Sequence, residues 1–143
     1  MGMLPSGLPD IVGDDEEVTR FLTQSSHYNS AMPKPAAFMP DPKNRNKSVF
    51  RCGANPERIR EIWEKTTNFQ QTLKAAAVCK TAEVRNAGVD VIAKEPPDAH
   101  ANIEGWPWLD NDPELQKAKQ KEIAAVIAQK SALVMCAMEK AKT

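Results

Sequence analysis

The sequence predicts a single α+β domain, in which a small, mostly antiparallel or mixed sheet of three to four short strands is covered by three helices. The 143 residues suffice for one domain of ordinary size. Hydrophobic residues make up 41% of the chain and charged residues 27%, which are usual values for a globular protein. Short β-branched runs also alternate with segments of helical pattern, the last of them long. We therefore expect residues 18–143 to form the domain, behind a leader of residues 1–17.

The leader is expected to be flexible. It contains five acidic residues, several Gly and Pro residues and no basic residue. Such a composition offers little apolar area to offset the entropy lost on ordering.

Three segments are expected to form strands, 18–22, 48–52 and 89–94, and residues 100–103 are a fourth candidate. Each is rich in β-branched or aromatic residues, and turn-forming residues lie near their ends. Between the first two strands, residues 23–47 contain four prolines, which forbid a continuous helix. We expect this stretch to be a long irregular connection, anchored on the core by Phe38 and Met39.

Three helices are expected. The first runs from the capping Asn55 to about residue 66, with apolar residues at helical spacing. The second covers residues 72–87, because its three consecutive alanines have high helix propensity and Gly88 can end it. The third begins after Asp112 and continues without a breaker to about residue 140. An Ala-rich helix followed by Gly and a β-branched strand indicates an α/β unit.

Composition excludes several classes of function. The formal net charge is zero, so nucleic-acid binding through a general positive field is not favoured. The longest apolar run, residues 132–138, is too short to span a bilayer. Three widely spaced cysteines show neither a metal-ligand spacing nor a disulfide framework, and no phosphate-binding or dinucleotide-binding glycine motif is present. We expect a cytoplasmic protein without metal or cofactor.

Two histidines open the same short pattern, His27-Tyr28-Asn29 and His100-Ala101-Asn102. A histidine pair can act as general base and general acid on a phosphodiester. In outline the pattern resembles the two-histidine phosphoesterases, which carry two copies of His, a spacer, and Thr or Ser on strands. This chain has Asn in place of the hydroxyl residue both times. The alternative is that His100 makes a structural hydrogen bond while His27 is solvated.

The second candidate site combines two tryptophans with a basic run. Trp106 and Trp108 flank Pro107 ahead of the last helix, and Lys43, Arg45 and Lys47 lie close together in the irregular connection. The tryptophans can close the core, anchor a protein partner, or stack on a nucleic-acid base beside the basic run.

These patterns leave two functions open. We expect a small cytoplasmic binding or regulatory protein that acts through protein contacts or self-association, with Trp106, Trp108 and the end of the last helix as its surface. The alternative is a hydrolase or phosphoesterase-like enzyme that uses His27, His100 and Asn102, with Arg51 or Arg20 neutralising an anionic substrate.

Overall fold

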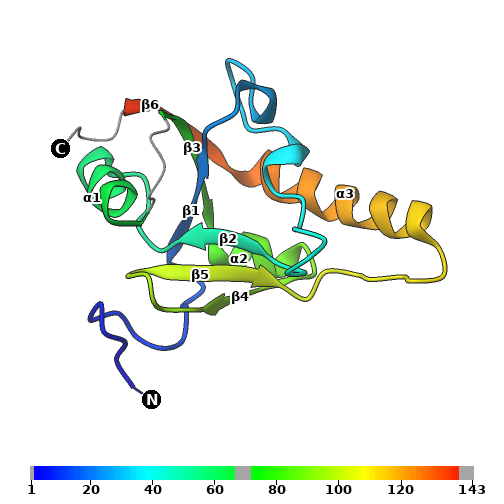
Figure 1. Ribbon diagram of the computed structural model, residues 1–143, viewed down its shortest axis with the longest axis horizontal. Coiled ribbons are helices and arrows are strands. Elements are labelled where there is room, and N and C mark those ends of the chain that lie inside the picture. The colour runs from blue at the N-terminus through cyan, green and yellow to red at the C-terminus, as the bar shows by residue number, and fades with distance from the viewer. Residues whose placement is uncertain (1, 67–71, 139–143) are drawn as a thin grey trace.

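The computed structural model describes residues 2–66 and 72–138 and shows a single α+β domain (Figure 1). Within these residues one antiparallel sheet has six strands in the order β4-β5-β2-β1-β3-β6. The strands are β1 (Glu17–Leu22), β2 (Lys47–Phe50), β3 (Leu73–Lys80), β4 (Asp90–Ala93), β5 (His100–Glu104) and β6 (Ala132–Met138). The helices are α1 (Pro56–Thr66), α2 (Thr81–Asn86) and α3 (Pro113–Lys130), with 3-10 turns η1 (Ser25–His27) and η2 (Pro35–Ala37) in the irregular connection. The predicted fold class is confirmed, with the last helix long, but the predicted number of strands is too small.

The predicted helix over residues 72–87 is wrong, because most of that segment is strand β3. Residues 75–79 are all buried, and the strand pairs with β1 on one side and β6 on the other. A strand in the middle of a sheet that is covered on both faces is apolar without alternation. Here only Lys80 at one end of the strand and Lys74 near the other end are exposed. The high helix propensity of alanine therefore loses to tertiary packing, and helix α2 keeps only six residues.

The last helix is also shorter than predicted. It ends at Lys130, where Ser131 adopts an extended backbone and its hydroxyl donates to the Ile127 carbonyl at 2.7 Å. The uncharged run that follows forms β6 at the edge of the sheet, so the expected helical end does not exist. In α3 itself, Ala124, Ile127 and Ala128 are buried.

The sheet carries a core on each face. Because side chains alternate along a strand, Phe21 of β1 and Phe50 of β2 lie on one face, where α1 packs through Ile59, Ile62 and Trp63. The opposite face is covered by α2, α3 and η2 (Figure 1). Its buried members include residues of all three of these elements and of five strands, namely Val18, Leu22, Ala37, Val49, Ala75, Ala77, Val84, Val91, Ala101, Ile103, Ala124 and Ile127.

Residues 2–16 lie against the domain through polar contacts. Glu16 bonds to Arg51, Asp14 forms an ion pair with Arg85 at 2.6 Å, and the Ser6 backbone donates to Glu95 at 3.1 Å. The flexibility expected of this leader stays a prediction.

Candidate functional site

Strands β1 and β2 are joined at one end and separate at the other. A single residue pair, Thr19 and Phe50, is in register between them, whereas β1 and β3 share six pairs within the described strands. The guanidinium group of Arg20 lies at the open end, where its Nε donates to the Ala37 carbonyl at 3.1 Å and its Nη1 to the Ser48 carbonyl at 3.3 Å. A positive charge is thus held between the strand ends by neutral carbonyl groups.

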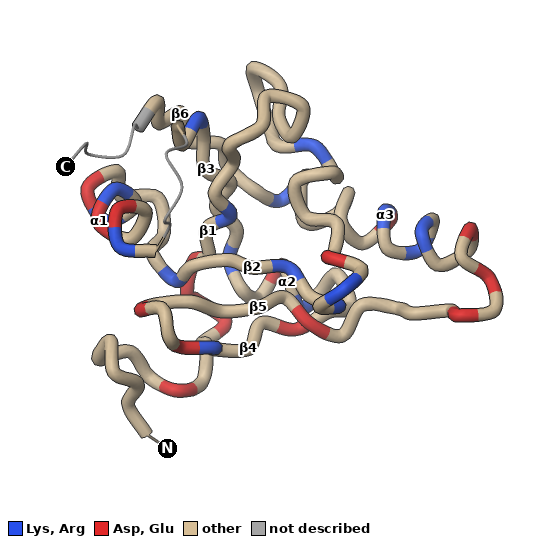
Figure 2. Tube along the Cα trace, in the orientation of Figure 1, with Lys and Arg blue, Asp and Glu red and all other residues tan. Residues whose placement is uncertain are grey.

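Two further basic side chains, Lys47 and His27, lie close to Arg20. Continuing the antiparallel register from Thr19 and Phe50 places Arg20 and Lys47 on the same face of the sheet. His27 lies in η1, which packs against η2. The Lys34 amide donates to the His27 carbonyl at 2.8 Å and fixes this arrangement. We call Arg20, Lys47 and His27 the cationic cluster. Figure 2 marks the Lys and Arg positions of the chain in blue and the Asp and Glu positions in red.

The pKa values of the cluster reflect this crowding. Burial lowers the pKa of Arg20 to about 10, which still leaves it charged at neutral pH. Burial and then the charge of Arg20 lower the pKa of Lys47 to about 8, although Asp41 acts in the opposite direction. Burial, followed by the charges of Arg20 and Lys47, lowers the pKa of His27. Each group therefore holds its proton less firmly than it does in water.

No carboxylate forms an ion pair with the cluster within the described part of the chain, although Asp41 acts on Lys47 from a greater distance. The ion pairs found there involve Arg45, Arg51, Arg58, Arg60, Lys65 and Arg85. Neither Arg20 nor Lys47 is among them. Half-buried charges are ordinarily paired, because removing them from water is costly without a partner. The cluster can therefore receive an anion.

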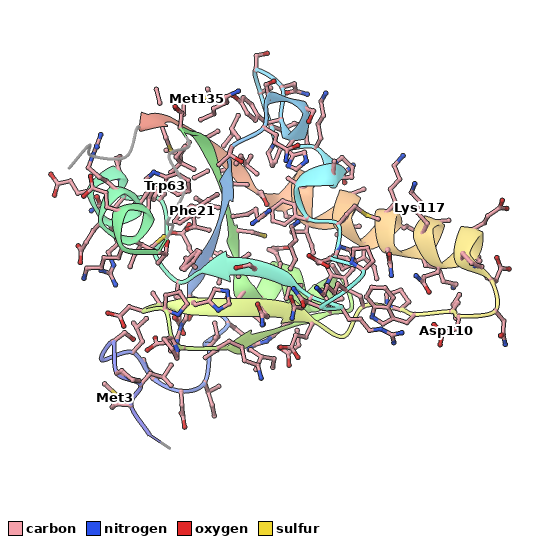
Figure 3. The ribbon with its side chains drawn as sticks, viewed as in Figure 1. Met3, Phe21, Trp63, Asp110, Lys117 and Met135 are labelled. Atoms are coloured by element: carbon pink, nitrogen blue, oxygen red, sulfur yellow. The ribbon has the colours of Figure 1, made fainter. Side chains whose placement is uncertain are left out.

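A pocket of about 310 Å³ opens beside Arg20. Its apolar wall consists of Phe21, Phe50 and Trp63, where Phe21 stacks on Phe50 at 4.9 Å between ring centroids and meets Trp63 edge-on at 5.7 Å. Figure 3 shows Phe21 and Trp63 side by side between α1 and the sheet. Its polar lining includes Thr23, Ser48 and Thr66.

The two predicted catalytic histidines lie on different sides of β2. His100 contacts Ser48, with 2.6 Å between its Nε2 and the serine Oγ, whereas His27 lies near Lys47. Lys47 and Ser48 are consecutive in a strand, so their side chains point to opposite faces. The structure thus joins His100 to a serine rather than to the second histidine.

Arg51, the predicted neutralising residue, is already paired. Its side chain is 1% exposed, and Nε and Nη2 each donate to the Glu16 carboxylate at 2.8 Å. The third contact, from Nη1 to the Pro9 carbonyl, is 2.7 Å long. The guanidinium therefore fastens the leader to the sheet.

The predicted tryptophan surface divides into two parts. Trp106 is buried in the core, where its Nε1 donates to the Ile103 carbonyl at 3.0 Å. Trp108 is half-buried, and the Arg45 guanidinium lies 4.9 Å from its ring centroid. Trp108 lines a groove of about 320 Å³ between α3 and the irregular connection, together with Met39, Pro40, Pro42, Pro113, Gln116, Lys117 and Gln120. Lys43 is exposed, while Lys47 belongs to the cationic cluster.

Comparison with protein-family models, curated proteins and solved structures finds no match to this chain. Among the residues that the structure describes, no helix has the length and apolar character needed to cross a membrane. Over the same residues, no group of His, Cys, Asp or Glu side chains is arranged to hold a metal ion.

Sequence reasoning did not select Ser48. The signal that could have identified it is the alternation of Ser48 and Phe50 in one strand and of His100 and Asn102 in another. Those four side chains meet only when β2 and β5 pair in the observed register.

Proposed function

We propose that the protein is a small binding protein that recognises a phosphate group, carried as a monoester, at the cationic cluster. The observation that supports this proposal is the half-buried positive charge of Arg20 and Lys47, neither of which forms an ion pair with a carboxylate within the described residues. Arginine and lysine are the residues that proteins use most for phosphate, since one offers a planar set of donors and the other a compact charge.

Arg20 has donors available for such a ligand. Two of its contacts go to backbone carbonyls through Nε and Nη1, and no described residue accepts a hydrogen bond from Nη2. A phosphate dianion bound there would favour the charged forms of Lys47 and His27 and would raise their pKa values. Binding is therefore expected to take up protons near and above pH 8, where Lys47 is partly deprotonated in the free protein.

Calorimetric titration of the folded protein with inorganic phosphate, phosphoserine and acetate tests this proposal. Phosphate and phosphoserine should bind more tightly than acetate, and the heat should change with the ionisation enthalpy of the buffer because protons are taken up. Arg20→Gln and Lys47→Gln should each weaken binding by about tenfold or more, since each removes a charge-assisted contact.

Lys43→Gln is the matched control. Lys43 is exposed and lies in the same basic run, so it shares the long-range charge of Lys47 but not its position. Equal weakening by Lys43→Gln and Lys47→Gln would reduce the effect to general charge and contradict the proposed site. The titration in several phosphate-free buffers provides the baseline.

A second candidate is a protein contact at the groove beside Trp108. The half-buried indole, Met39 and three prolines form an apolar surface of the kind that receives an extended segment of another protein. Lys117 on its rim would pair with an acidic side chain of that segment. Affinity for a partner identified with the wild-type protein should fall more than tenfold in a folded Trp108→Ala variant. Unchanged affinity would exclude the groove.

We keep a cytoplasmic location as part of the proposal. The three cysteines are free thiols, and burial raises the pKa of Cys52 and of Cys79. Such unreactive thiols are consistent with a reducing compartment.

A further inference from the structure

Ser48, His100 and Asn102 share one face of the sheet. In the antiparallel pairing of β2 with β5, Ser48 lies opposite Asn102 and Phe50 lies opposite His100. Residues that are paired or two apart in such strands project to the same side. The register therefore gathers a hydroxyl, an imidazole and a carboxamide within a few ångströms of one another, on two rigid strands.

The serine and the histidine are arranged as a nucleophile and its base. His100 Nδ1 lies 2.8 Å from the Lys94 carbonyl oxygen, which can only accept, so Nδ1 carries the proton and donates. Nε2 is then an acceptor, and the Ser48 hydroxyl donates to it across 2.6 Å. A base within hydrogen-bonding reach of a hydroxyl, and oriented by a third group, is the arrangement that activates serine.

Asn102 supplies an unused donor next to the hydroxyl. The residue is 9% exposed, yet no described residue makes a hydrogen bond to its carboxamide. The carboxamide is not a fully buried group without a partner, so its N–H remains accessible to water or to a ligand. A carboxamide N–H beside a nucleophile can stabilise the negative oxygen that forms when a carbonyl is attacked.

The neighbouring pocket indicates the class of substrate. Ser48 and Phe50 point to the face on which Phe21 and Trp63 form the aromatic wall, so a group attached to the attacked carbonyl has an apolar surface beside it. We propose that Ser48 is the nucleophile of a carboxylic-ester hydrolase, with His100 as its general base and Asn102 as the donor to the oxyanion. The Lys94 carbonyl is a positioning group, because it acts only through His100.

The reaction runs through an acyl-enzyme. The Ser48 oxygen bonds to the ester carbonyl carbon, the serine proton moves to His100 Nε2, and the carbonyl oxygen becomes an oxyanion held by Asn102. Collapse breaks the bond to the alcohol oxygen, which leaves with the proton from His100. A water molecule, deprotonated by His100, then attacks the acyl carbon. Release of the carboxylic acid returns the proton to Ser48.

Two measurements on the full chain test this proposal. An alkyl fluorophosphonate should label the wild-type protein on the peptide that contains Ser48, as located by mass spectrometry. The wild-type protein should also hydrolyse p-nitrophenyl acetate, and Ser48→Ala should remove that activity. His100→Gln should lower kcat by about a hundredfold and Asn102→Ala by about tenfold to a hundredfold, with KM less affected.

Ser30→Ala is the matched control, because Ser30 is an exposed serine outside this constellation. Its activity should equal that of the wild type. Labelling of another residue, no labelling at all, or equal hydrolysis by the wild type and Ser48→Ala would overturn the proposal. Labelling of the unmutated protein answers the question even where a variant fails to fold. Phosphate binding is a separate outcome, since Arg20 contacts the backbone carbonyl of Ser48, which Ser48→Ala retains.

Discussion

Arg20 and Arg51 lie beside opposite ends of strand β2 and differ in what surrounds them. Arg51 is 1% exposed and donates two hydrogen bonds to one carboxylate and one to a carbonyl. Arg20 is half-buried and donates to two carbonyls, with Lys47 rather than a carboxylate as its charged neighbour. The chain thus neutralises one guanidinium internally and leaves the other positive.

This difference separates a structural role from a binding role. The charge of Arg51 is matched by Glu16, so a ligand would have to compete with an intramolecular pair that is already in place. The charge of Arg20 is held in position by carbonyl dipoles, and an anion arriving from solution meets no internal competitor. Residue type alone does not distinguish the two arginines, because the distinction lies in their partners.

The largest expected effect is the loss of stability caused by Arg51→Met. This change removes both bonds to Glu16 and frees the Pro9 carbonyl, so it should lower the free energy of unfolding by about 3 kcal/mol. Arg20→Met should cost less than about 1 kcal/mol, because it also relieves an unpaired half-buried charge. Urea unfolding of both variants measures the difference. Equal losses would mean that Arg20 is structural as well.

Much of the fold could be predicted because local pattern and tertiary environment agree there. Helix α1 starts after Asn55, whose side-chain oxygen accepts from the Glu57 amide at 2.9 Å, as the capping pattern predicts. The helix predicted over the β3 segment is wrong because three alanines favour a helix in isolation, whereas their small side chains suit a strand buried on both faces. That burial depends on both α1 and α3, and α3 is distant in the sequence.

Less of the candidate site could be predicted. His100 and Asn102 form one pattern in the sequence, but their neighbour Ser48 is recognised only from the pairing of β2 with β5. The sequence does not favour Arg20 over Arg51, since nothing in it shows that Glu16 is bonded to Arg51. Strand register and ion-pair partners are long-range properties, and single-residue chemistry does not encode them.

Glu16→Gln should have an intermediate effect on the same contact. Burial by itself raises the pKa of Glu16, but the hydrogen bonds from Arg51 and the Gly13 amide outweigh it, so the pKa of Glu16 lies below 4.5. The stabilisation is therefore complete above the unfolded pKa and is lost as the pH falls through the folded value. Glu16→Gln should remove about 2 kcal/mol at pH 7 and much less at pH 3. A loss that does not depend on pH would assign the effect to packing.

Lys47→Met should change stability in the opposite direction. Because the pKa of Lys47 is lowered to about 8, the unfolded chain binds its proton more tightly than the folded chain does. The contribution of Lys47 to the free energy of unfolding is smallest below pH 8 and rises as the pH increases from about 8 to 10.5. Removing the charge should stabilise the protein at pH 7 by about 1 kcal/mol, a value reduced for solvent screening of a half-buried group. Thermal unfolding at pH 7 and pH 10 should show the gain only at pH 7.

A third arginine, Arg45, is expected to contribute least to stability. Arg45 lies over the Trp108 ring and forms an exposed ion pair with Asp110 at 3.6 Å, in which both side chains are more than half exposed. Water screens such contacts, so Arg45→Ala should lower the free energy of unfolding by only about 0.5 kcal/mol, mainly through the lost cation–π contact. The part of this loss that comes from the ion pair with Asp110 should vanish in 1 M salt, where charges are screened within about 3 Å. A loss comparable to that of Arg51→Met would show that Trp108 depends on Arg45 for its position, which would change the groove proposed for a protein partner.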